Sequence, residues 1–194
     1  SDGREETQVL HLNPKSGRWL PDNTHLQRHV NAAIAYNVWR HYEATGDAEF
    51  LSVYGAEMLV EIARFWASIA SFNAERGRYE IRGVMGPDEF HDRYPWAEKP
   101  GLDNNAYTNG MAITVLRYAT QAAQDLGRTP NPDWNHVADN IPIVQFPDGT
   151  TRETDTYEGE IIKQADANLL AYPMKIVNGE SRIRQDLEYY EPRM

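Results

Sequence analysis

Apolar residues recur every three to four positions in three stretches of this chain, which is the spacing of one face of an α-helix. The stretches cover residues 24–46, 58–72 and 103–127. The first and third start at a residue type that caps helices and end at a glycine. The pattern therefore predicts three long helices. The apolar positions are Val30, Ile34, Val38 and Tyr42 in the first, Met58, Ile62, Phe65, Ile69 and Phe72 in the second, and Tyr107, Met111, Val115, Tyr118 and Ala122 in the third.

Shorter elements are expected in the rest of the chain. Apolar and charged residues alternate over 78–83, which predicts a strand. Helical spacing predicts short helices over 133–140, 161–172 and 181–190. Residues 7–23 contain Asn-Pro, Ser-Gly and Pro-Asp pairs and are expected to form a loop. Long helices, long loops and minor short strands together indicate an all-α fold.

The charge and the missing residue types exclude several functions. The 194 residues carry 29 acidic against 19 basic side chains, a formal net charge of −10, and no cysteine. This balance argues against nucleic acid and membrane surfaces as partners. Without cysteine there is neither a disulfide nor a thiolate nucleophile. No apolar run suits a membrane helix or a signal peptide, so the cytoplasm is the expected location, and the charged start without methionine indicates a cut chain.

Generic catalytic and metal-binding motifs are missing from the sequence. It has no glycine-rich phosphate loop and no serine nucleophile elbow. His25 and His29 are four residues apart, a spacing that can hold a metal from one helix face. No third ligand accompanies them, so no metal site is predicted.

One loop carries candidate chemistry. Gly86-Pro87 ends the predicted strand, and Asp88 and Glu89 follow among apolar and aromatic neighbours. A partly desolvated carboxyl group has a raised pKa and stays protonated, as a general acid that protonates a glycosidic oxygen must. Adjacent side chains diverge, so only one of the two is expected to face a substrate. A solvated acidic loop that caps the next helix explains the pattern equally well.

These residues resemble a known signature. Residues 83–91 (GVMGPDEFH) with 103–109 (DNNAYTN) closely resemble the catalytic-acid region of glycoside hydrolase family 65. That family includes maltose, trehalose and kojibiose phosphorylases and acid trehalases. Further similar segments follow in the expected order and cover most of the chain. They are SGRW at 16–19, LQRHVN at 26–31, TGD at 45–47, IKQAD at 162–166, LLAYP at 169–173 and the end segment 186–192.

The resemblance implies a fold, a reaction and a set of roles. Residues 1–194 would form part of an (α/α)6 catalytic barrel, with no second domain. The reaction would be inverting cleavage of an α-linked glucose disaccharide or α-glucoside of the trehalose, kojibiose or maltose type. Glu89 takes the general-acid position, and Lys163 and Gln164 take positions that hold the glucosyl hydroxyls. Weaker candidates for the aglycone side are His91, Asn104, Asn105 and Tyr107, of which Asn104 is equally plausible as a helix cap.

The resemblance also implies which substrates and partners to expect, and it leaves alternative reactions open. The substrate would be a small-molecule glucoside, with no metal or organic cofactor. Hydrolysis is favoured because residues 145–160 are closer to the acid-trehalase-like branch. Residues 94–101 lengthen the acid loop relative to the phosphorylase pattern, which weakens any transfer of phosphorylase substrate preference to this chain. The alternatives are phosphorolysis to glucose 1-phosphate, with inorganic phosphate as co-substrate, and a non-catalytic carbohydrate-binding fragment. The base or phosphate loop is expected after Met194, and the incompletely covered helix face at 58–69 predicts self-association or a homodimer.

Overall fold

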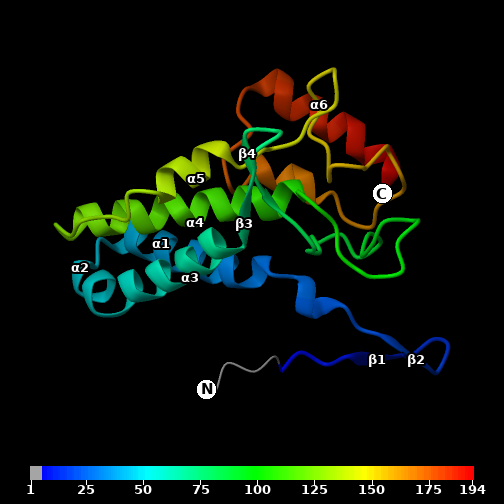
Figure 1. Ribbon diagram of the computed structural model, residues 1–194, viewed down its shortest axis with the longest axis horizontal. Coiled ribbons are helices and arrows are strands. Elements are labelled where there is room, and N and C mark those ends of the chain that lie inside the picture. The colour runs from blue at the N-terminus through cyan, green and yellow to red at the C-terminus, as the bar shows by residue number, and fades with distance from the viewer. Residues whose placement is uncertain (1–5) are drawn as a thin grey trace.

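Three long helices lie side by side and build the main core of the computed structural model, which describes residues 6–194 (Figure 1). They are α1 (His29–Thr45), α3 (Ala56–Ile69) and α4 (Ala106–Asp125). Helix α4 contacts α1, α3 and α5 (Trp134–Asn140), and most of its side chains are buried. It is rich in small residues, which let its neighbours approach closely and cover nearly every face.

Other helices are short. The turn between α1 and α3 contains α2 (Ala48–Phe50) and the π-helical turn η2 (Leu51–Gly55). The 3₁₀ segments are η1 (Thr24–Leu26), η3 (Asp166–Leu170) and η4 (Glu191–Arg193), and α6 (Glu180–Tyr190) lies near the C-terminus. This helical content with little strand confirms the expected fold class, whereas closure of a barrel stays a prediction. No helix in residues 6–194 is long and apolar enough to cross a membrane. Residues 1–5, which include the start interpreted as a cut, are outside the described part.

Two antiparallel hairpins are the only sheets among the described residues. Strands β1 (Leu10–Asn13) and β2 (Arg18–Pro21) form the first, and β3 (Ala70–Asn73) and β4 (Arg78–Ile81) form the second. The β1–β2 hairpin projects from the helical body beneath the loop that follows β4 (Figure 1). The sequence prediction of a plain loop over 7–23 is therefore wrong. Likewise Phe72 lies in β3, opposite Tyr79, and does not continue α3.

The helix predicted over 161–172 is also wrong. Residues before Asp166 run without regular structure, and only the 3₁₀ turn η3 follows. A tertiary contact fixes this segment: the Asp88 carboxylate accepts the backbone N–H groups of Lys163 and Gln164, at 2.7 and 3.2 Å. These two hydrogen bonds hold residues 163–164 against the loop that follows β4, and the side chains of Lys163 and Gln164 contact the candidate acid Glu89 there.

The buried helix faces differ partly from the predicted ones. In α1 the fully buried positions are Ala32 and Ala35, whereas Val30 and Ile34 are 57% and 46% exposed. In α3 the predicted Met58 is 40% exposed, and a neighbouring face carrying Leu59, Ala63 and Trp66 enters the core. Small alanines and large side chains such as Trp66 share the buried faces of these helices. Of the apolar face expected to be incompletely covered, Met58 is exposed, whereas Ile62, Phe65 and Ile69 pack against the core, and self-association stays a prediction.

An ion cluster fixes the second hairpin. Glu80 on β4 is only 2% exposed, and its Oε1 accepts hydrogen bonds from Arg78 and Arg76 at 3.0 and 3.2 Å. Its Oε2 accepts from Arg82 and Asn73 at 2.5 and 3.0 Å. Burial alone would raise the pKa of Glu80, but these donors, led by Arg82, lower that pKa to about 2. The carboxylate therefore stays ionised and ties the strand to the loops around it.

Replacing this carboxylate tests its contribution. Glu80→Gln is expected to lower the free energy of unfolding by about 1–3 kcal/mol at pH 7, because charge-assisted hydrogen bonds are lost while the arginines remain partly solvated. Because the folded-state pKa lies below the ordinary value of 4.5, the effect is present above pH 4.5 and is lost as the pH falls through about 2. Urea unfolding at several pH values measures it. The exposed Glu75→Gln in the same hairpin turn is the control, and equal stability of both variants at pH 7 would contradict the assignment.

Candidate functional site

The loop between β4 and α4, residues 82–105, carries the candidate acid and is anchored at its base. Val84 and Leu102 exchange backbone hydrogen bonds of 3.0 and 2.8 Å, so the two ends of the loop lie side by side. The Asp103 N–H donates to the Tyr94 hydroxyl at 2.8 Å, which fixes the far part of the loop. Residues 88–91 are thus presented from a rigid base.

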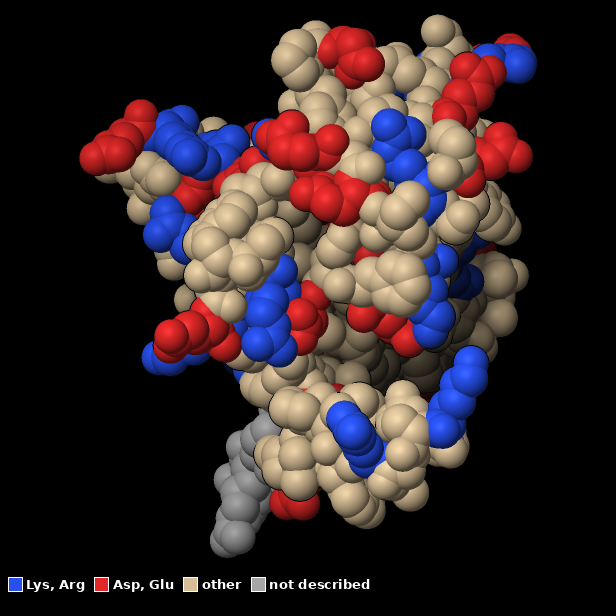
Figure 2. All heavy atoms as spheres, turned by 90° about the vertical axis from the view of Figure 1, so that its right-hand side faces the viewer, with Lys and Arg blue, Asp and Glu red and all other residues tan. Residues whose placement is uncertain are grey.

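Glu89 lines an open cavity of about 510 Å³ between this loop and the β1–β2 hairpin. Other lining side chains are His11, Gln27, His29 and Met85. The side of the molecule that bears the loop and the hairpin is visibly hollowed between the hairpin and the helical body, with acidic and basic side chains nearby (Figure 2). The volume and mixed lining suit a small polar ligand.

The side chains of Lys163 and Gln164 contact Glu89, although neither residue lines this cavity. Lys163 Nζ lies 2.5 Å from Glu89 Oε2, and Gln164 Nε2 donates to Glu89 Oε1 at 3.0 Å. The Glu89 N–H donates in return to Gln164 Oε1 at 3.3 Å. The structure therefore brings together all three residues that the resemblance singled out, from positions more than seventy residues apart.

The electrostatics of Glu89 differ from the sequence expectation. Its side chain is 55% exposed, so desolvation is slight. The hydrogen bond from Lys163, followed by that from Gln164, holds the pKa of Glu89 below its usual value. The predicted raised pKa is therefore wrong for this structure, in which Glu89 is an ionised carboxylate paired with a cation.

Asp88 points the opposite way from its neighbour and is 1% exposed. Its Oδ1 accepts the two backbone N–H groups of Lys163 and Gln164, and its Oδ2 lies 2.9 Å from His91 Nδ1. Burial would raise the pKa of Asp88, but the His91 contact and the two N–H groups together lower it. Asp88 is thus an internal clamp that holds the Lys163–Gln164 segment beside Glu89. The sequence pattern predicted the divergence of the two carboxylates but not this role.

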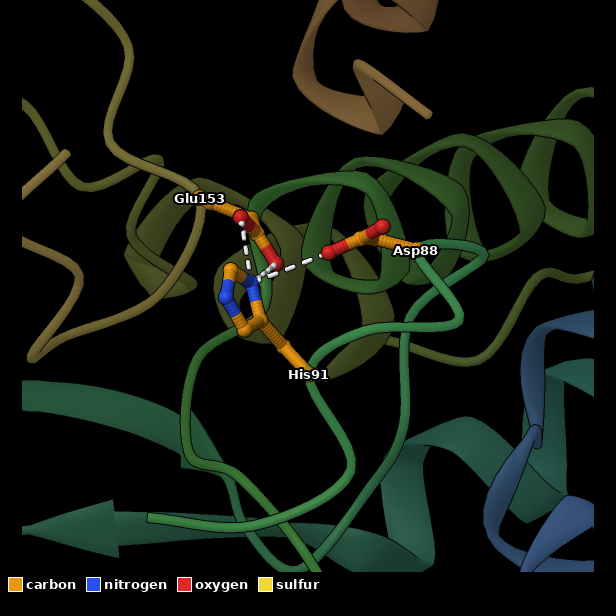
Figure 3. Close-up of side chains that lie close together, drawn as sticks. All are labelled: Asp88, His91 and Glu153. Carbon is orange, nitrogen blue, oxygen red and sulfur yellow. Dashed lines mark hydrogen bonds and ion pairs between the residues drawn. The ribbon is translucent and has the colours of Figure 1, made fainter. Parts of the chain in front are cut away.

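His91 bridges two buried carboxylates (Figure 3). Its Nδ1 lies 2.9 Å from Asp88 Oδ2 and 3.0 and 3.1 Å from the two Glu153 oxygens. The hydrogen bonds to Asp88 and Glu153 raise the pKa of His91 to about 10. At neutral pH this residue is therefore an imidazolium. Its Nδ1 contacts the two buried carboxylates and cannot contact a substrate. Substrate binding by the other atoms of the His91 ring stays a prediction.

The acidic cluster extends inward. Glu153 is 1% exposed, and burial raises its pKa. Asp166 is buried as well, which holds its pKa well above the usual range, and Asn105 Nδ2 donates to its Oδ2 at 3.0 Å. Sequence reasoning did not find Glu153, because nothing local connects it with His91, sixty-two residues away. Asp166 was visible only as part of the IKQAD segment.

The Asp88–His91–Glu153 group has ligand types that suit a metal, and their atoms lie within 4.8 Å of one another. His91 Nδ1, however, is already at hydrogen-bond distance from both carboxylates. The imidazolium itself supplies the positive charge that a buried pair of carboxylates requires. The geometry is that of an ion-pair cluster.

Asn104, Asn105 and Tyr107 lie away from Glu89. Asn104 and Asn105 are fully buried: Asn104 Oδ1 accepts the Ile81 N–H at 3.3 Å, and Asn105 Oδ1 caps α4 by accepting the Thr108 N–H at 2.8 Å. Neither side chain is accessible, so Asn104 and Asn105 have structural roles in place of the predicted contacts with substrate. The cap is Asn105, not Asn104. Tyr107 packs edge-on against His29, with ring centroids 5.5 Å apart, and lines a different cavity.

Comparisons with known proteins place the chain in a family. The sequence model of the glycosyl hydrolase family 65 central catalytic domain matches residues 1–143. A kojibiose hydrolase of Flavobacterium johnsoniae is 42% identical over 99% of this chain. A kojibiose phosphorylase of Thermoanaerobacter brockii is 47% identical over 63% of it.

The match to a solved structure concerns the fold alone. A protein from the human microbiome, provisionally named a kojibiose phosphorylase, superposes with a TM-score of 0.66 at 22% identity, over 84% of this chain and 27% of its own. The chain spans 25% of the hydrolase and 14% of the Thermoanaerobacter brockii phosphorylase. The family match and the hydrolase confirm what the acid loop predicted: the chain belongs to glycosyl hydrolase family 65, within whose central catalytic domain residues 1–143 fall.

Proposed function

We propose that the whole protein cleaves an α-glucosidic bond of a small glucoside or disaccharide, with Glu89 as general acid. One observation carries this proposal: the Glu89 carboxylate faces an open cavity and is held by the side chains of Lys163 and Gln164. A carboxyl group flanked by a charged and an amide donor suits a sugar ring, which offers several hydroxyl groups in fixed geometry. As the family match suggests, residues 1–194 would be part of its helical barrel.

The reaction needs Glu89 to gain a proton. Without ligand, Lys163 keeps it ionised. When glucosyl hydroxyl groups accept the hydrogen bonds that Lys163 and Gln164 otherwise donate to Glu89, the pKa of Glu89 rises and its carboxyl group becomes protonated. It then gives that proton to the glycosidic oxygen as the bond between this oxygen and the anomeric carbon breaks. Water, which gives a proton to a carboxylate acting as general base, or phosphate attacks the anomeric carbon from the opposite face and inverts its configuration.

Hydrolysis is the favoured outcome, and phosphorolysis is the alternative. The kojibiose hydrolase is 42% identical over 99% of the chain, whereas a kojibiose phosphorylase of Halothermothrix orenii that matches 87% of the chain is 28% identical. We expect the whole protein to release glucose from kojibiose in phosphate-free buffer, at a rate that added inorganic phosphate changes less than twofold. A coupled assay for glucose and for glucose 1-phosphate measures both products. Turnover that appears only with phosphate, with glucose 1-phosphate as product, would favour phosphorolysis.

A further inference from the structure

A second cavity adjoins the loop that carries Glu89. It has a volume of about 290 Å³ and is lined by Phe90, His91, Trp96 and Tyr157, among others. Glu89 does not line it, whereas Asp92 lines both cavities. The two cavities therefore share the segment 89–92 as a wall, and consecutive side chains of this segment enter different cavities.

Aromatic rings form one side of this second cavity. The rings of Tyr94 and Trp96 stack with centroids 5.2 Å apart and an interplanar angle of 2°. Tyr94 is itself held by the Asp103 N–H, so the Trp96 indole, 72% exposed, has a fixed support. Phe90 adds a ring that is 59% exposed. Flat, exposed and pre-positioned rings bind the apolar face of a ligand ring at little entropic cost.

Polar groups complete the lining. Thr154 and Thr156 contribute aliphatic hydroxyl groups, and Glu160 adds an acceptor. The second ring nitrogen of His91 points away from the two carboxylates that hold Nδ1 (Figure 3). An imidazolium uses this nitrogen as a donor.

Charge at this second cavity is balanced. Arg93 forms an ion pair with Asp92 at 3.0 Å, and the charge of His91 is matched by its own buried partners. The cavity therefore offers neither a cationic nor an anionic cluster for a charged ligand. It offers ring faces together with hydroxyl, carboxylate and N–H groups, which is the chemistry that a neutral, polyhydroxylated ring requires.

We propose that this second cavity is a carbohydrate-binding site, distinct from the cavity at Glu89, in which a hexose ring stacks on Trp96 and hydrogen-bonds to the threonine and histidine groups opposite. The proposal goes beyond bond cleavage, because it requires neither Glu89 nor Lys163. It rests on the proposed function only in taking a sugar as the ligand.

Titration of the isotope-labelled chain with kojibiose, followed by amide NMR, tests this proposal. We expect shifts at Thr154, Thr156 and Trp96, and a dissociation constant about tenfold higher in Trp96→Ala. Trp19→Ala is the matched control, because Trp19 is 65% exposed on β2 and lies outside this cavity. Phe90→Ala, a second exposed position in the cavity, is expected to weaken binding severalfold.

Lys163→Ala separates this site from the one at Glu89. It is expected to abolish shifts around Glu89 and to leave those at Thr154 and Thr156 unchanged. If kojibiose shifts only the residues around Glu89, or if Trp96→Ala binds as tightly as the wild type at Thr154, the second site is refuted while the proposed function stands. Loss of both sets of shifts in Lys163→Ala also refutes it, because the two sites would then be one.

Discussion

Glu89→Gln is expected to lower kcat for kojibiose about 10²- to 10⁴-fold in the whole protein, which is the usual contribution of a positioned general acid. The amide keeps the shape of the side chain and an oxygen that can accept from Lys163, so KM should change no more than a few-fold. Initial rates over a range of kojibiose concentrations separate the two constants. An aryl α-glucoside with a good leaving group should lose far less activity, because its departing oxygen needs no proton.

The same loop provides a matched control. Glu98 is exposed and lies seven residues after His91, and Glu98→Gln makes the same chemical change without touching the cavity at Glu89. We expect its kcat to stay within twofold of the wild type. Equal turnover of Glu89→Gln and Glu98→Gln would contradict the acid assignment. If sugar binding then persisted, the non-catalytic carbohydrate-binding alternative would be the better description.

The sequence alone predicts only those parts of the site that lie within one continuous motif. Asp88 and Glu89 are adjacent, and chain geometry alone separates their directions. The meeting of Glu89 with Lys163 and Gln164 depends on a contact across seventy-four residues, which no local pattern encodes. It was predicted because both segments resemble the same family.

The errors in the fold have physical causes. Residues 161–172 have helical spacing of apolar side chains, but hydrogen bonds from the Lys163 and Gln164 N–H groups to Asp88 hold the start of this segment against the loop that follows β4. Leu10 and Leu12 alternate with polar residues, which weakly indicates strand β1. The turn-forming residue pairs in the same segment favoured the prediction of a loop instead. In α1 the large apolar residues suggested the buried face, whereas small alanines allow the close packing that defines it. Tertiary contacts thus overrode local preference at each place.

His91→Gln is expected to lower the free energy of unfolding of the chain by about 3–5 kcal/mol near pH 6.5, because Asp88 and Glu153 would remain buried without their cation. The pKa of His91 is raised from 6.5 to about 10 in the folded state. Its stabilising contribution is therefore complete below pH 6.5 and is lost as the pH rises through about 10. Urea unfolding at pH 6.5, 8 and 10 should show the difference between variant and wild type shrinking as the pH rises.

A variant that loses one buried carboxylate together with the histidine separates the effect of charge on stability from the effect of packing. The double variant His91→Gln/Glu153→Gln should recover part of the lost stability, because only Asp88 would remain without a cation, and Asp88 still accepts the N–H groups of Lys163 and Gln164. His136→Gln, an exposed position on α5, is the control and should stay within about 0.5 kcal/mol of the wild type. A double variant less stable than His91→Gln would contradict the charge argument. Since Asp88 also holds the segment that meets Glu89, the stability of this cluster and the placement of the acid depend on the same buried contact.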